Sequence, residues 1–108
     1  MLDLIIKNGE CYINGKLENN DIAIKGGKIS KIGKVLEEAK EVYDAKGQIV
    51  LPGCIDTQTH FREPGSTDTE DLHSGSRAAV VGGITAVFEM PNTNPPTSNL
   101  KEFQRKLD

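Results

Sequence analysis

The sequence has little of several residue types that define common classes of protein. Tryptophan is absent, and the only two cysteines, Cys11 and Cys54, fit no CxxC pattern. We therefore expect two free cysteines, with neither a disulfide framework nor a cysteine-based zinc site. The 13 Lys and Arg side chains nearly balance the 16 Asp and Glu side chains. This balance leaves no basic patch of the kind that binds nucleic acid.

Long hydrophobic runs are missing as well. Residues 2–6 are apolar except for Asp3, and this interrupted run is too short for a secretory signal peptide or a membrane span. We therefore expect a soluble cytoplasmic protein that does not bind a membrane.

The first half of the chain has the pattern of short strands joined by tight turns. Ile22 and Ile24 alternate with polar residues, as in a strand with one buried face. Turn signals recur at Asn8-Gly9, Asn14-Gly15 and Gly26-Gly27. Asn-Gly favours the primed hairpin turns, in which both central residues have positive φ. Residues 1–52 are therefore predicted to form a small antiparallel β unit.

The pattern changes after Pro52. Residues 53–60 are predicted to form a strand, and residues 84–90 are nearly continuously apolar, as in a parallel strand covered on both faces. Between them a helix is predicted, with a capping box at Thr67-x-x-Glu70 and a stop at Gly82-Gly83. A last helix over residues 100–107 follows a cap at Ser98 or Asn99.

This succession of strand, helix, strand and helix is the start of an α/β fold rather than a finished one. A TIM-type (β/α)8 barrel needs eight such units and about 250 residues. We therefore predict two parts, with residues 1–52 forming part of a small β-sandwich and residues 53–108 forming the first two βα units of a barrel. The chain is expected to be incomplete.

Polar side chains are dense where the two predicted strands end. The first strand leads into Asp56, Gln58, His60 and Arg62, and the second leads into a loop that holds Asn92. Sites of parallel α/β folds are built at the carboxyl ends of strands. Because alternate residues of a strand share one face, the four side chains of the first segment are expected to point the same way, into the barrel mouth.

Three motifs now stand in order along the chain. They are Gly53-x-Ile55-Asp56-x-x-x-His60-Phe61-Arg62-Glu63-Pro64-Gly65, then Arg77-Ala78-Ala79 with Gly82-Gly83-Ile84-Thr85, then Met90-Pro91-Asn92-Thr93-x-Pro95. Together they resemble the amidohydrolase superfamily in its dihydroorotase form. Allantoinases and hydantoinases are relatives, and the combination of Arg62 with Asn92 resembles dihydroorotases rather than those.

The resemblance implies a role for each matching residue. His60 matches the second histidine of the His-x-His pair that binds one metal of a zinc pair. Gln58 stands where the first histidine is expected, so the number of zinc ions, one or two, stays open. Arg62 matches the arginine that holds the substrate carboxylate, and Asn92 matches the asparagine that shares it. The remaining ligands and the catalytic aspartate are expected beyond residue 108, so this segment alone is expected to be inactive.

The resemblance also implies a function, with alternatives. The first is reversible, metal-dependent hydrolysis of dihydroorotate to N-carbamoyl-L-aspartate in de novo pyrimidine synthesis. The second, favoured by Gln58, is an inactive dihydroorotase-like partner of aspartate transcarbamoylase. The third is a related hydantoinase or allantoinase. A homodimer is a further possible assembly under the first hypothesis.

Simpler roles are open to the charged residues of these segments. Arg62 could pair with Glu63 or Asp56, and Glu89 could pair with an arginine. Asp56 is expected to orient groups of the first strand or to cap nearby backbone, as metal sites require of the residues behind the ligands. His73 is expected to be a solvated helix residue without a role.

Overall fold

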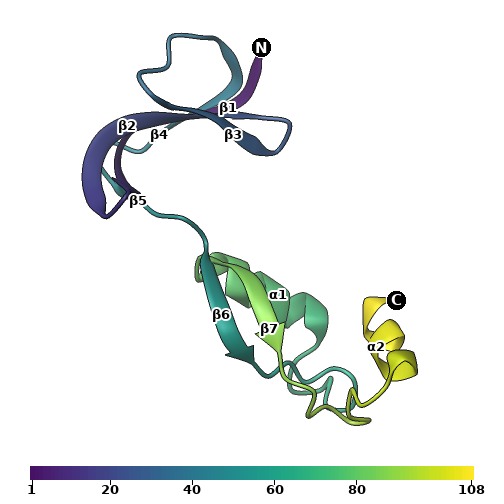
Figure 1. Cartoon of the computed structure of the whole chain (residues 1–108). Helices are drawn as coiled ribbons and strands as arrows, with labels where there is room; N and C mark the ends of the chain where they lie inside the picture. The colour runs from purple at the N-terminus through teal and green to yellow at the C-terminus, as the bar shows by residue number, and fades with distance from the viewer. The chain divides into compact units, whose positions relative to one another are not determined.

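The computed structural model describes all 108 residues, which form two compact units, Met1–Pro52 and Gly53–Asp108. The first unit contains only strands, and the second alternates strands with helices (Figure 1). No helix has the length and apolar character needed to cross a membrane. The α/β class predicted from the sequence is thus confirmed at the level of its elements.

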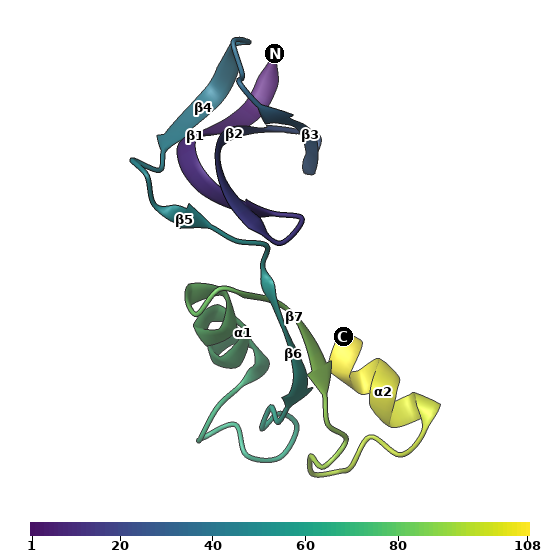
Figure 2. The same ribbon diagram turned by 60° about the vertical axis from the view of Figure 1, so that its left-hand side comes forward.

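The first unit is a five-stranded sheet. Its strands are β1 (Leu2–Ile13), β2 (Lys16–Lys25), β3 (Lys28–Gly33), β4 (Ala39–Asp44) and β5 (Ile49–Val50). The order is β3-β2-β1-β4, with β5 also paired to β1. The long strands β1 and β2 curve strongly (Figure 2).

The prediction of an antiparallel unit is right for three strands and wrong for two. β1, β2 and β3 pair antiparallel through hairpins, whereas β4 and β5 both run parallel to β1. A hairpin turn fixes the direction of the next strand, and the local sequence reveals it. The direction of β4 depends on the longer connection after β3, and a local pattern does not encode it.

Two of the three predicted turns are present. Asn14 and Gly15 have φ of 49° and 81°, both positive, as the primed hairpin between β1 and β2 requires. Gly26 and Gly27 likewise turn the chain between β2 and β3. The predicted turn at Asn8-Gly9 is wrong, because β1 continues through it with a register shift between Ile6 and Gly9. The positive φ of Asn8 marks a bulge rather than a reversal.

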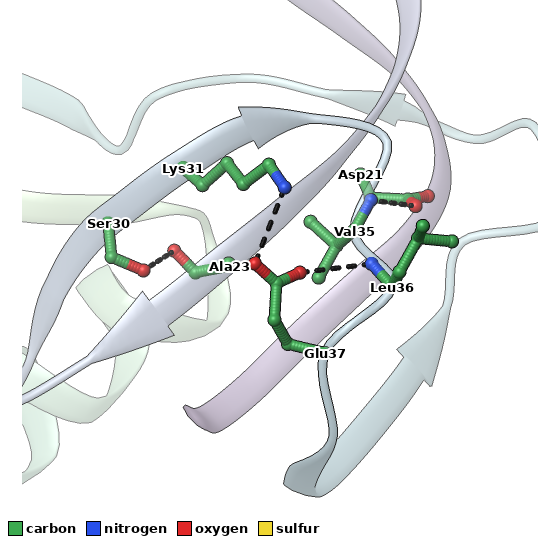
Figure 3. A network of polar contacts seen from close by, with 7 residues as sticks. All are labelled: Asp21, Ala23, Ser30, Lys31, Val35, Leu36 and Glu37. Atoms are coloured by element: carbon green, nitrogen blue, oxygen red, sulfur yellow. Dashed lines mark hydrogen bonds and ion pairs between the residues drawn. The ribbon is translucent and has the colours of Figure 1, made fainter. Parts of the chain in front are cut away.

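The core of the first unit lies between its strands and the loop after β3. Ile5, Ala23 and Val35 are its buried cluster. The Asp21 carboxylate accepts a hydrogen bond from the Val35 amide at 3.1 Å (Figure 3) and another from the Asn8 amide at 3.0 Å. These amides, Asn8 foremost, hold the pKa of Asp21 below its ordinary value. Asp21 thereby ties the bulge of β1 to the loop that closes the core.

The remaining contacts drawn in Figure 3 hold the edge of the same sheet. The Ser30 hydroxyl donates to the Ala23 carbonyl at 3.2 Å, and Glu37 accepts from the Leu36 amide and from Lys31. Both free cysteines occur as predicted, with Cys11 buried in β1 and Cys54 exposed at the start of the second unit.

The second unit follows the predicted order of elements. It consists of β6 (Cys54–Thr59), α1 (Leu72–Val81), β7 (Ile84–Glu89) and α2 (Leu100–Leu107), and β6 pairs parallel with β7. Because the strands are parallel, the loops that follow them leave the same end of the pair, as both views show (Figures 1 and 2).

The helix caps agree with the sequence in one case and differ in the other. The side chain of Asn99 accepts a hydrogen bond from the Glu102 amide at 3.0 Å. Of the two predicted candidates, Asn99 is therefore the N-cap of α2. The N-cap of helix α1 is Asp71, four residues after the predicted cap at Thr67, and its carboxylate accepts a hydrogen bond from the Ser74 amide at 2.6 Å. This bond lowers the pKa of Asp71. The predicted box fails because Ser66 instead accepts the Glu70 amide in a turn ahead of the helix.

Helix α1 approaches the loop after β6 so closely that one position has no room for a side chain. Gly75 is the one buried residue of the helix, and a Cβ there would lie 2.8 Å from the ring of Phe61. Phe61 stands between His60 and Arg62 in the sequence. Gly75 therefore sets how closely the helix supports the residues of the predicted site.

Replacing Gly75 with Ala should lower the stability of the full-length protein that contains this segment. Alanine favours a helix interior by about 1 kcal/mol over glycine, but the added methyl must displace Phe61, and such overpacking costs about 1–3 kcal/mol. We expect a lower urea midpoint for Gly75→Ala.

Gly82→Ala is the matched control. Gly82 caps the same helix with φ of −79°, and its nearest atoms lie at 3.4 Å and beyond, so alanine fits there. Its urea midpoint should be unchanged or higher. If Gly75→Ala raised the midpoint as Gly82→Ala does, the close contact with Phe61 would be refuted.

Candidate functional site

The loops after β6 and β7 are joined by backbone contacts. The Met90 amide donates to the Thr59 carbonyl at 2.8 Å, and the Asn94 amide donates to the Pro64 carbonyl at 3.0 Å. Gly65 makes the second contact possible, since a Cβ at that position would lie 2.6 Å from the Asn94 carbonyl oxygen. Two loops that are distant in sequence are thereby held against each other.

His60 and Asn92 meet across these loops. The Nδ1 atom of His60 lies 2.8 Å from the Oδ1 atom of Asn92, and both side chains are exposed. An amide oxygen can only accept a hydrogen bond, so the imidazole donates through Nδ1. The lone pair of the neutral ring is then on Nε2, the nitrogen that remains free to bind another group.

The first strand departs from regular alternation just before His60. The ladder between β6 and β7 shifts register between Asp56 and Thr59, which places an extra residue on β6. The Asp56 carboxylate accepts a hydrogen bond from the Gln58 amide at 3.0 Å. Asp56 thus caps backbone, as expected, and holds the bulge in place.

The bulge corrects one expectation from the sequence. Asp56, Gln58, His60 and Arg62 were expected to share one face through strict alternation. The alternation is interrupted at the bulge, and β6 ends at Thr59, so Arg62 lies in the loop beyond the strand. The physical reason is that a bulge changes the direction in which the neighbouring side chains point. The direction of Gln58 is therefore set at the bulge, and that of Arg62 by the loop, rather than by the strand period.

Arg62 has no partner within the chain. It is exposed and takes part in none of the four salt bridges. Its two suggested partners are engaged elsewhere, because Asp56 binds the Gln58 amide and Glu63 accepts from the Leu72 amide at 2.7 Å. The guanidinium is thus available to an anion that comes from outside.

Glu89 is paired, but with a lysine rather than the expected arginine. Lys106 of α2 lies 2.9 and 3.0 Å from the two carboxylate oxygens of Glu89, and the side chains are only 8% and 22% exposed. Sequence reasoning missed Lys106 because the contact joins the end of β7 to a helix 17 residues later. The pair anchors α2 to the strand and leaves Glu89 unavailable as a free acid or base. His73 is exposed on α1, as expected of a solvated helix residue.

The donors present fit only part of a zinc site. No group of three or more His, Cys, Asp or Glu side chains gathers in this chain. His60 fits a metal ligand, since ligating histidines typically donate their other ring N–H to an oxygen, as His60 does to Asn92. Gln58 does not fit, because zinc prefers imidazole, thiolate and carboxylate over a neutral amide.

A parallel α/β unit with polar loops at the carboxyl ends of its strands has the layout of an enzyme site. The model of the amidohydrolase family matches residues 49–107. The chain therefore belongs to the amidohydrolase family, which confirms the resemblance seen in the motifs.

Individual relatives carry two different names. An allantoinase of Salmonella choleraesuis is 50% identical over 107 residues, which are 98% of this chain and 24% of the relative. A dihydroorotase of Methanosarcina mazei is 46% identical over 110 residues, which are 100% of this chain and 24% of the relative. The chain thus spans about a quarter of these relatives.

A solved structure with a related fold also matches this chain. The L-hydantoinase of Arthrobacter aurescens matches with a TM-score of 0.88 and 34% identity, over 98% of this chain and 24% of that one.

Replacing Gln58 with His should increase the zinc content of the full-length protein that contains this segment. The change supplies a second imidazole two residues before His60, and imidazole binds zinc where a neutral amide does not. We expect up to about one further zinc ion per chain, measured by elemental analysis after dialysis against a weak chelator.

Gln104→His on the exposed side of α2 serves as the control for an added surface imidazole, and its zinc content should equal that of the unchanged protein. Equal zinc content in Gln58→His and the unchanged protein would mean that position 58 is not beside a metal.

Proposed function

We propose that the full-length protein containing this segment hydrolyses dihydroorotate reversibly to N-carbamoyl-L-aspartate, as a cytoplasmic enzyme of pyrimidine synthesis. The observation that carries the proposal is the unpaired guanidinium of Arg62, which lies two residues after His60. A guanidinium without a partner in the chain can bind a carboxylate through two parallel hydrogen bonds, and dihydroorotate carries a carboxylate.

The proposal includes the architecture around the site. Residues 53–108 are the first two βα units of a TIM-type barrel, and residues 1–52 are part of a small β-sandwich. Apolar side chains on β6 and β7 support this assignment, since Ile55 and Phe88 are both 59% exposed. Parallel strands are normally covered on both faces, so further elements are needed to cover these two.

Each residue then has a distinct task. Arg62 holds the substrate carboxylate through two parallel hydrogen bonds, which a lysine cannot make. Asn92 shares that carboxylate through its amide N–H groups. His60 is a metal ligand through Nε2. A bound zinc ion would lower the pKa of water and polarise the amide carbonyl. The proton-transferring group and the other ligands come from outside this segment.

Overall similarity does not choose among the cyclic amide substrates. The allantoinase and the dihydroorotase differ by only four percentage points in identity to this chain, 50% against 46%. We favour dihydroorotate because Arg62 and Asn92 flank His60 from two loops, and both can hold a carboxylate. Enzymes that act on hydantoin or allantoin need not bind a carboxylate in this way.

A second candidate function is a scaffold without catalysis. Gln58 favours it, because this residue removes one of the two imidazoles expected in the first strand. The protein would then serve as a partner of aspartate transcarbamoylase. The intact residues His60, Arg62 and Asn92 favour catalysis instead.

The test is a panel of substrates offered to the zinc-loaded full-length protein. We expect hydrolysis of dihydroorotate to exceed that of allantoin and of hydantoin. Arg62→Gln should lower kcat/KM for dihydroorotate at least about 30-fold, since the bound substrate carboxylate would lose its hydrogen-bonded charge partner at a cost of about 2 kcal/mol or more. Arg62→Lys should restore only part of this loss.

Arg77→Gln is the matched control, because Arg77 is an exposed arginine of α1 outside all salt bridges. Its kcat/KM should stay at the level of the unchanged protein. If the protein hydrolysed allantoin faster than dihydroorotate, the proposed substrate would be wrong, and allantoin would take its place. Absence of turnover with all three substrates, together with binding to aspartate transcarbamoylase, would establish the scaffold.

A further inference from the structure

Backbone hydrogen bonds hold the two loops together on both sides of the contact between His60 and Asn92. Residue 92 follows Met90, whose amide is bonded to Thr59, and it precedes Asn94, whose amide is bonded to Pro64. The backbone on both sides of Asn92 is therefore held against the loop that carries His60. The 2.8 Å contact joins side chains whose backbones are already fixed relative to each other.

No carboxylate takes the place of Asn92 beside His60. Asp56 of β6 and Glu63 of the following loop are the acidic residues nearest to it in sequence, and their oxygens accept hydrogen bonds from the amides of Gln58 and Leu72. Histidines that bind metals commonly donate their second N–H to a carboxylate, a carbonyl or water. Here the amide oxygen of Asn92 is the acceptor.

We propose that Asn92 is a positioning residue that holds His60 in the tautomer with the proton on Nδ1, so that Nε2 faces the metal. The inference rests on the proposed function in so far as that function makes His60 a ligand. It adds a task to the one that the family resemblance implies. The two tasks use different atoms, since Oδ1 accepts from His60 and the amide N–H groups stay free for a substrate carboxylate.

Two variants separate these tasks. Asn92→Asp keeps an oxygen acceptor for His60, but it removes the amide donors and places a negative charge against the substrate carboxylate. Asn92→Leu has a similar size and removes both functions. Asn92 is exposed, so neither change disturbs a packed core.

The first readout is the tautomer of His60 in the metal-free full-length protein. It is measured by ¹⁵N NMR, since the two ring nitrogens of an imidazole have different chemical shifts with and without a proton. A His60→Gln variant identifies the signal. We expect the Nδ1–H form in the unchanged protein and in Asn92→Asp, and a mixture of tautomers in Asn92→Leu. A predominant Nε2–H form in the unchanged protein would overturn the inference directly.

The second readout is zinc affinity, measured by competition with a coloured chelator. Asn92→Leu should weaken binding about 10- to 100-fold, the effect expected from losing the partner of a ligating histidine. Asn92→Asp should retain the affinity. Asn94→Leu is the matched control in the same loop, because the side chain of Asn94 is exposed and only its backbone amide is engaged. Unaltered affinity in Asn92→Leu would overturn the proposal.

Activity distinguishes this inference from the proposed function. If dihydroorotate is the substrate, Asn92→Asp should raise its KM while the zinc affinity and the tautomer are retained. If the tautomer and the zinc affinity respond to Asn92→Leu but dihydroorotate is not hydrolysed, the proposed function fails and the positioning role stands.

Discussion

The parallel pairing of β6 with β7 is the constraint on which the candidate site depends. Parallel strands send their following loops from the same end of a sheet, so His60 and Asn92, 32 residues apart, can meet at 2.8 Å. The chain also approaches itself closely at three glycines of the second unit. Gly53 leaves no room for a side chain beside Thr85 of β7, Gly65 touches the second loop, and Gly75 touches Phe61.

Around this pairing, most charged side chains near the site already have a structural task. Asp56 holds the bulge, Glu63 binds the first amide of α1, and Glu89 is tied to Lys106. Arg62 is the exception, with its guanidinium unpaired. This contrast is the physical basis for proposing Arg62, rather than any of its charged neighbours, as the anion-binding residue.

Several features of the fold could be predicted from the sequence because they depend on neighbouring residues alone. The positive φ of Asn14 and Gly15, the cap at Asn99 and the order of strands and helices in the second unit follow from short-range preferences. The directions of β4 and β5, the bulge in β6 and the Glu89–Lys106 pair were missed. These features depend on which distant segments meet, and neither periodicity nor turn residues encode that. The His60–Asn92 contact belongs to the same group, although both residues had been singled out by their motifs.

The most direct test is a crystal structure of the full-length protein with zinc and N-carbamoyl-L-aspartate. We predict that the Arg62 guanidinium binds one carboxylate of the ligand through two parallel hydrogen bonds, and that Nε2 of His60 lies about 2.0–2.1 Å from zinc. His60 Nδ1 should still donate to Oδ1 of Asn92. A ligand whose carboxylates are bound elsewhere, with Arg62 turned to solvent and no metal at His60, would contradict it.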